Sequence, residues 1–98
     1  MIVIIRALVN SGFEQEAARI QQAAHDLAKA TPGFIAADEF TREGGAVVVL
    51  LEFESHEALA VWRDNPANPA TQTAGRDRLY KHYRIQVCDI VREYEFAG

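Results

Sequence analysis

The hydrophobic residues near the start of the chain follow first the period of a strand and then that of a helix. Residues Ile2–Val9 are rich in Ile and Val, which predicts a β-strand. The next apolar positions are three and four residues apart, as on one face of an α-helix. They are Phe13, Ala17, Ile20, Ala24 and Leu27. Ser11 and Glu14 match a capping box, so we expect this helix to begin near Gly12, with His25 on its solvent side.

The middle of the chain predicts two strands and a second helix. Phe34–Thr41 and Ala46–Phe53 are strand-like, and the short turn between them makes them antiparallel neighbours. Ser55 is suited to cap the helix that follows. The inner face of this helix is predicted to consist of Ala58, Val61 and Trp62.

The last third predicts a short helix and a closing strand. Pro66 ends the second helix, and Asn68-Pro69 has the pattern of an N-cap followed by proline at the first helical position. A short helix is therefore expected from there to about Tyr80. Tyr83–Phe96 is predicted to form a long final strand.

This order of elements predicts an α+β fold. Strand, helix, strand, strand, helix, short helix and strand make a ferredoxin-like split βαβ plait, with four antiparallel strands and helices on one face. The 98 residues leave room for a single domain, residues 1–98.

The third predicted strand is apolar on both faces. Val47, Val49 and Leu51 point to one side, and Ala46, Val48 and Leu50 point to the other. Since a plait carries helices on only one face of its sheet, the second face needs another cover. We expect a homodimer in which two such sheets pack together as a dimeric α/β barrel. Ile90–Phe96 would then be long enough to pair with the partner chain.

Charge and composition narrow the partners. The protein has a net charge of −4, so it lacks the excess of basic residues that favours binding to nucleic acids and anionic membranes. The longest apolar run, Ala46–Leu51, is far short of the ~20 residues of a membrane-spanning helix, and Met1–Ile5 lacks the basic start of a signal peptide. Cys88 is the single cysteine, which excludes a disulfide within the chain. These features predict a cytoplasmic protein without a nucleic-acid or membrane partner.

Two groups of residues are candidates for chemistry. Trp62 is either a core anchor or the aromatic wall of a ligand pocket between helices and sheet. Tyr80, His82, Tyr83 and Arg84 gather where the short helix meets the last strand. His82 and Arg84 could polarise an anionic oxygen, or they could form a solvated strand face or a polar layer between subunits.

No metal site and no cofactor are predicted. Glu52, Glu54 and His56 alternate along the chain, but their spacing matches no zinc or iron pattern. The sequence also has no glycine-rich phosphate loop, so a bound dinucleotide or flavin is not expected.

Several short segments carry a family resemblance. They are Pro32-Gly33-Phe34, Glu52-Phe53, Ser55-His56-Glu57-Ala58-Leu59, Trp62-Arg63, Gly75-Arg76 and Tyr83-Arg84-Ile85-Gln86-Val87. With them, the stretch from Pro32 to Phe96 resembles the antibiotic biosynthesis monooxygenase domain, and the first strand and helix fit as well. The resemblance implies a homodimer with one pocket per subunit. The family includes quinol and polyketide oxygenases that use neither metal nor flavin, and also haem-degrading enzymes.

The resemblance also implies functional positions. The tryptophan of the second helix matches Trp62, whereas Ile5 and Gln72 stand where haem-degrading members have an Asn and a His, so haem degradation is disfavoured. Ala58 and Asn68 stand where polyketide oxygenases place polar partners of the tryptophan. We take Trp62, His82, Tyr83 and Arg84 as candidate catalytic residues, and Trp62, Asn68, Gln72 and Tyr80 as candidate substrate-binding residues.

Two classes of function follow. The first is a cofactor-independent monooxygenase of a small electron-rich aromatic, such as a quinol, an anthrone or a polyketide-like compound. His82 or a tyrosine would be the base, and Arg84 would hold the oxyanion. The alternative is a non-catalytic ligand-binding or accessory barrel protein, or a polyketide-type cyclase or isomerase that needs no oxygen.

Overall fold

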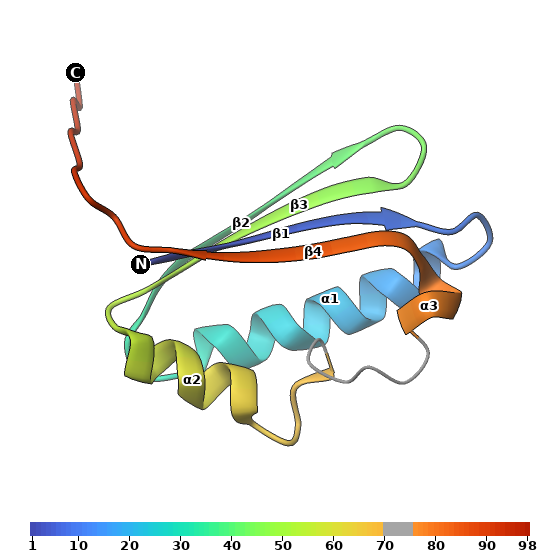
Figure 1. Cartoon of the computed structure of the whole chain (residues 1–98), viewed down its shortest axis with the longest axis horizontal. Coiled ribbons are helices and arrows are strands. Elements are labelled where there is room, and N and C mark those ends of the chain that lie inside the picture. Colours follow the sequence, from blue (N-terminus) through green and yellow to red (C-terminus); the bar gives the residue numbers. More distant parts are fainter. Residues whose placement is uncertain (70–75) are drawn as a thin grey trace.

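The elements follow the predicted order in the computed structural model of the chain, which describes residues 1–69 and 76–98. They are β1 (Ile2–Val9), α1 (Glu14–Lys29), β2 (Phe34–Arg42), β3 (Ala46–Phe53), α2 (His56–Asp64), α3 (Arg76–Leu79) and β4 (Tyr80–Cys88) (Figure 1). The four strands form one antiparallel sheet in the order β2-β3-β1-β4. The helices lie on one face of that sheet, which confirms the predicted plait.

Alternation along the strands divides the sheet into an inner face, which the helices cover, and an outer face. On β1, Val3, Ile5, Ala7 and Val9 are buried on the inner face. Small residues let α1 approach closely, because the buried positions of the helix are Ala17, Ala24 and Ala28. The predicted helical spacing is therefore correct for α1.

Phe53 is the centre of the core beneath α2. Its ring is fully buried and lies between Phe34, in an edge-to-face contact with ring centroids 6.0 Å apart, and Trp62, at 5.8 Å. Gly33 lets the chain pass close to α2 just before this cluster. It has a positive φ of 92°, and a Cβ atom there would lie 2.7 Å from the Ala58 side chain.

The two predicted helix caps have different outcomes. Ser55 caps α2 as expected, because its Oγ accepts a hydrogen bond of 3.1 Å from the Ala58 backbone N–H. The predicted Ser11 cap of α1 is wrong, since the N-cap residue is Phe13 and no side chain caps it. The Glu14 carboxylate accepts from the Gly12 N–H at 2.9 Å rather than from the Ser11 N–H, as a capping box would require.

The predicted inner face of α2 is correct at two of its three positions. Ala58 and Trp62 are buried, but Val61 is 58% exposed. Leu59 is buried in its place, because α2 turns the side of Leu59 rather than that of Val61 toward the sheet.

The last strand is shorter than predicted. Pairing of β4 with β1 ends at Cys88, opposite Ile2, and the remaining residues leave the sheet as an extended segment (Figure 1). Val91, Tyr94 and Phe96 in this segment are exposed. Pairing of Ile90–Phe96 with a partner chain stays a prediction. Within the described residues, no helix is both long and apolar enough to cross a membrane.

Candidate functional site

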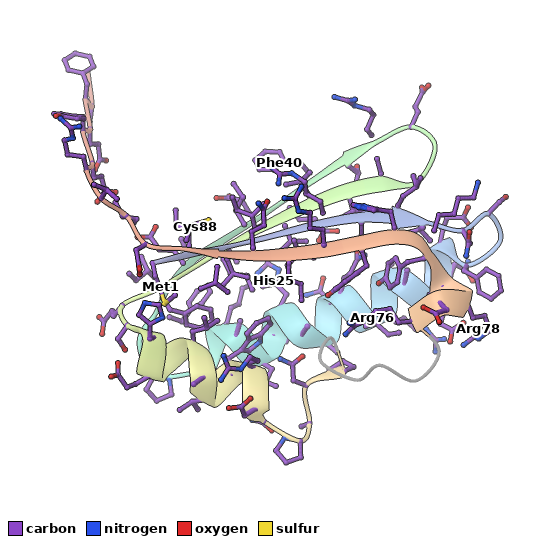
Figure 2. All side chains as sticks on the ribbon, viewed as in Figure 1. Met1, His25, Phe40, Arg76, Arg78 and Cys88 are labelled. Carbon is purple, nitrogen blue, oxygen red and sulfur yellow. The ribbon has the colours of Figure 1, made fainter. Side chains whose placement is uncertain are left out.

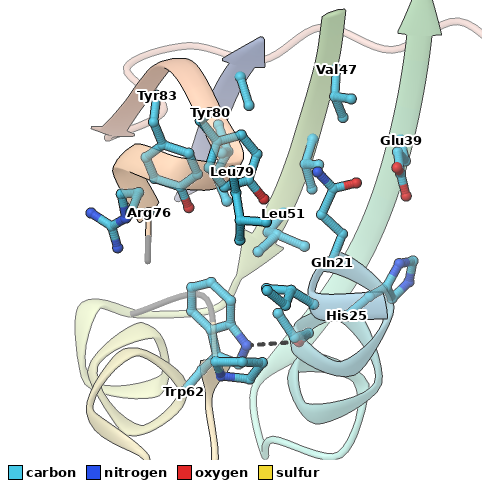
Figure 3. Close-up of a pocket in the computed structure, with 16 residues that line it drawn as sticks. Gln21, His25, Glu39, Val47, Leu51, Trp62, Arg76, Leu79, Tyr80 and Tyr83 are labelled. Carbon is cyan, nitrogen blue, oxygen red and sulfur yellow. Dashed lines mark hydrogen bonds between the residues drawn. The ribbon is translucent and has the colours of Figure 1, made fainter. Parts of the chain in front are cut away.

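A pocket of about 200 Å³ lies between the inner face of the sheet and the helices (Figure 3). It is larger than the apolar cavity of roughly 150 Å³ that admits a benzene molecule. Its walls are mostly apolar, and short side chains at Ala7 and Ala24 leave room between the larger ones. The apolar lining residues are Ile5, Ala7, Ile20, Ala24, Val47, Val49, Leu51, Trp62, Pro69 and Leu79. The pocket therefore has the size and surface for a small aromatic ring.

One side of the pocket carries two tyrosines and an arginine. The rings of Tyr80 and Tyr83 lie 5.1 Å apart, and the Arg76 guanidinium carbon lies 4.6 Å from the centre of the Tyr83 ring. Strict alternation along β4 would place Tyr80 and Tyr83 on opposite faces. An irregularity in the pairing with β1, where Leu8 and Val9 are opposite His82 and Tyr80, brings both rings into the pocket.

Burial keeps both tyrosine hydroxyls protonated. It raises the pKa of Tyr80, against the opposing effects of a hydrogen bond with the Gln21 side chain and of the Arg76 charge. Burial also raises the pKa of Tyr83, again opposed by Arg76. At neutral pH both groups are hydrogen-bond donors that can face an oxygen of a ligand.

The opposite side of the pocket carries His25 on α1 and Glu39 on β2 (Figure 3). The expectation that His25 faces solvent is wrong, because the imidazole is half-buried and lines the pocket. Gln21, one helical turn earlier, lines it too. The signal in the sequence is that both residues follow directly after apolar positions, Ile20 and Ala24, so they border the buried face of the helix.

Trp62 combines the two roles considered for it. The indole is 4% exposed and packs on Phe53, as a core anchor does, yet it also forms part of the pocket wall. Its Nε1 donates a buried hydrogen bond of 3.0 Å to the Ala24 carbonyl oxygen. The indole N–H is therefore used to join α2 to α1 and is not directed at a ligand.

Asn68 supports α2 and has no place in the described pocket lining. It is fully buried, and its Nδ2 donates to the Trp62 carbonyl oxygen at 2.9 Å. Its backbone N–H donates to the Asn65 carbonyl oxygen, also at 2.9 Å. The predicted contact of Asn68 with substrate is thus replaced by a contact with the end of the helix. Gln72, the other polar candidate nearby, lies outside the described residues.

The structure does not bring His82 and Arg84 to the pocket. They alternate with Tyr83 on β4, opposite Leu8 and Arg6 of β1, and both are exposed on the outer face of the sheet. The four candidates at the start of the last strand are therefore divided, with Tyr80 and Tyr83 inside and His82 and Arg84 outside. Only the tyrosines are placed to meet a ligand in this pocket.

Contacts near the surface, made by partly buried residues with the exposed Arg78, hold α3, which carries Arg76. The Arg78 guanidinium makes two hydrogen bonds to Glu16 on α1, of 3.0 and 2.8 Å, and lies 5.2 Å from the centre of the Phe13 ring. The bond to Arg78 lowers the pKa of Glu16, so the carboxylate stays ionised. Asn10 adds a bond of 2.9 Å from its Nδ2 to the Arg78 carbonyl oxygen.

Glu52, Glu54 and His56, which alternate along the chain, do not form a group that could hold a metal ion in the described structure. His56 Nε2 lies 2.7 Å from Asp89 Oδ1, and both side chains are exposed. In the described part of the chain, no three His, Cys, Asp or Glu side chains are grouped so that they could hold a metal ion.

Known structures share this fold. A proposed antibiotic biosynthesis monooxygenase from Nitrosomonas europaea matches with a TM-score of 0.76 at 11% identity, over 93% of this chain and 98% of that one. Rv0793 from Mycobacterium tuberculosis matches with a TM-score of 0.80 at 20% identity, over 96% and 97%. The chain has the fold of antibiotic biosynthesis monooxygenases. The resemblance predicted from the sequence is confirmed at this level.

A further match has a described activity. SnoaB, a cofactor-independent oxygenase from Streptomyces nogalater, matches with a TM-score of 0.68 at 17% identity, over 94% of this chain and 96% of SnoaB. No family model and no curated protein sequence matches the chain. At these identities, the shared property is the arrangement of helices and strands.

Proposed function

We propose that this protein is a cofactor-independent monooxygenase that oxidises a small electron-rich aromatic compound, such as a quinol, an anthrone or a related polyketide-like molecule. The observation that carries this proposal is the pocket itself. It joins an apolar, ring-sized interior to protonated Tyr80 and Tyr83 hydroxyls on one side and to His25 and Glu39 on the other. The fold shared with the oxygenase SnoaB supports it.

The chemistry needs little from the protein beyond binding and proton transfer. A quinol that loses a hydroxyl proton becomes an electron-rich phenolate, which can reduce molecular oxygen. One oxygen atom is added to a carbon of the ring and the other is released as water. Hydroquinone and O₂ therefore give hydroxyquinone and H₂O without an external reductant. Tyr80 and Tyr83 would donate hydrogen bonds to an oxygen on which negative charge develops, and Arg76 would add positive charge beside them.

We also propose that the protein acts as a homodimer through the outer face of its sheet. An apolar band on this face, which none of the described helices covers, consists of Ile4, Leu8, Val48 and Leu50. Phe40 projects from the same face with 59% of its surface exposed (Figure 2). Arg6, which is hydrogen-bonded to Gln86, interrupts this band between Ile4 and Leu8 and is opposite Val48. Two copies packed through this face would cover the band, and the exposed apolar residues that follow Cys88 offer a second surface to the partner.

Oxygen consumption tests the proposed reaction. The purified protein is mixed with hydroquinone, 1,4-naphthoquinol and anthrone in aerated buffer, and oxygen uptake and products are followed. We expect uptake above the rate in buffer for at least one compound, with one atom of ¹⁸O₂ in the product. Heat-denatured protein is the control, and equal uptake in the two samples for every compound would contradict the proposal.

A second candidate function is binding without turnover. It is favoured by the fact that Trp62 and Asn68, two expected substrate contacts, use their side-chain N–H groups on backbone carbonyl oxygens. A carrier would bind the same aromatic compounds and release them unchanged. A cyclase or isomerase would convert its substrate equally well without oxygen, so anaerobic incubation separates these possibilities from the oxygenase.

A further inference from the structure

The polar groups around the pocket differ in whether the protein already engages them. The Gln21 side chain acts on the Tyr80 hydroxyl and opposes the effect of burial on its pKa, and the Arg76 guanidinium lies over the Tyr83 ring. His25 and Glu39, by contrast, make no hydrogen bond or ion pair with any residue that the structure describes. Their nitrogen and oxygen atoms are therefore available to a molecule in the pocket.

We infer, resting on the proposed function for where the ligand binds, that His25 is the proton acceptor of this pocket and that its ligand is a phenol with a hydrogen-bond-accepting oxygen at its far end. The hydroxyl would lie at His25, and the far oxygen would accept from Tyr80 or Tyr83. Because these groups line opposite sides of one pocket, a ring bound between them would present one end to His25 and the other end to the tyrosines (Figure 3).

The proton transfer balances within the pocket. The phenol O–H bond breaks, its electron pair stays on the oxygen, and the proton forms an N–H bond on a neutral imidazole. This step leaves a phenolate and an imidazolium. Glu39, an exposed carboxylate on the same side of the pocket, would add a solvent-screened attraction to the imidazolium. A carboxylate is the weaker base of the two residue types, so Glu39 has a positioning and electrostatic role rather than that of the acceptor.

Few other groups can take part in the titration. Glu39 on β2, Arg76 on α3, and Tyr80 and Tyr83 on β4 are the other charged or titratable side chains in the described lining. The residues that β1, β3 and α2 contribute to that lining are not titratable. Residues 70–75, with the sequence ATQTAG, contain no acidic, basic, histidine or tyrosine residue. His25 is thus the one imidazole among these groups.

The ionisation of a bound phenol tests this assignment without any oxidation. 4-Nitrophenol carries a hydroxyl at one end and an accepting nitro group at the other, oxygen does not oxidise it, and its absorption moves to longer wavelength when it ionises. We expect the wild-type protein to bind it and to ionise it at a lower pH than in free solution. In the His25→Gln variant, bound 4-nitrophenol should be half-ionised only at a higher pH. The proton concentration at that point should be at least about tenfold lower than for the wild-type protein.

Two further variants sharpen the result. His56→Gln removes an exposed imidazole away from the pocket, and it should ionise the probe as the wild type does. Glu39→Gln should shift the ionisation in the same direction as His25→Gln, by a smaller factor. Should His25→Gln fail to fold, NMR of the His25 ring in the wild-type protein replaces it, and addition of 4-nitrophenol should then produce the imidazolium signal.

Each outcome bears on one proposal or the other. If wild-type protein does not bind 4-nitrophenol, or if His25→Gln ionises it as the wild type does, the inference is overturned. An unchanged neutral His25 signal in the NMR measurement overturns it as well. If His25 is required for ionisation but no quinol supports oxygen uptake, the inference stands and the proposed oxygenase reaction fails.

Discussion

The two faces of the sheet show how differently one set of strands can be used. On the inner face, Val3, Leu51 and Phe53 are buried in the core beneath the helices, and Leu51 also lines the pocket. On the outer face, a band of similar hydrophobic character is covered by none of the residues that the structure describes. Tyr83 and Arg84 are adjacent in sequence, yet the first meets the pocket and the second faces away. The proposed ligand site therefore lies on the inner face, and the proposed dimer interface lies on the outer face.

The largest expected effect compares two phenylalanines on opposite faces. Phe53→Ala should lower the free energy of unfolding by about 3–5 kcal/mol, because it empties a fully buried site in the core. In a domain stabilised by roughly 5–15 kcal/mol, this is a large part of the total. Phe40→Ala, at an exposed position, should cost far less within one chain. Denaturant unfolding at low protein concentration, where any dimer is dissociated, measures both, and equal losses would contradict this division of the sheet.

A charge on the outer face should separate the partners. Val48→Asp replaces one residue of the apolar band, where each fully buried aliphatic side chain contributes about 1.5–3 kcal/mol. A buried carboxylate also carries a desolvation cost, which Arg6 opposite position 48 offsets only in part. We expect a monomer, or loss of folded protein, in sedimentation experiments. Val61→Asp is the matched control, because Val61 is an exposed valine on α2. A stable dimer of Val48→Asp would rule out the outer face as the interface.

The smallest effect compares the adjacent residues of β4. Tyr83→Phe removes one hydrogen-bond donor from the pocket, whose net contribution of about 0.5–1.5 kcal/mol corresponds to roughly a 2–13-fold loss of affinity for 4-nitrophenol. Arg84→Gln alters only the outer face and should leave that affinity within twofold of the wild type. Calorimetric titration of both variants measures the difference. A larger loss with Arg84→Gln would return this residue to the site.

The fold was predictable because its signals are local. The period of residues 13–27 and the apolar run of β3 specify their elements without knowledge of distant contacts. Errors occurred where neighbouring turns compete, as at Ser11, or where the orientation of a helix on the sheet decides burial, as at Val61 and Leu59. The length of β4 depends on its partner β1, which ends its pairing at Ile2.

The site was less predictable, because it depends on positions that only the assembled fold brings together. No residue pattern near His25 predicts that Glu39 lines the same pocket. The irregularity that turns Tyr80 toward Tyr83 arises from pairing with a strand more than 70 residues earlier (Val9 with Tyr80). The sequence offered two roles for Trp62, and the indole both packs in the core and lines the pocket, but the hydrogen bond of its N–H to Ala24 depends on the packing of two helices.

The central place of β1 in the sheet also governs how the chain can fold. The hairpin of β2 and β3 is local and can form within about 1–10 μs. By contrast, β1 pairs with β3 and with β4, so that Ile2 is opposite both Glu52 and Cys88. Contacts between residues so far apart in sequence slow folding, because a long loop must close before they form. During synthesis, the apolar first strand must therefore wait with one edge unpaired until β4 has left the ribosome.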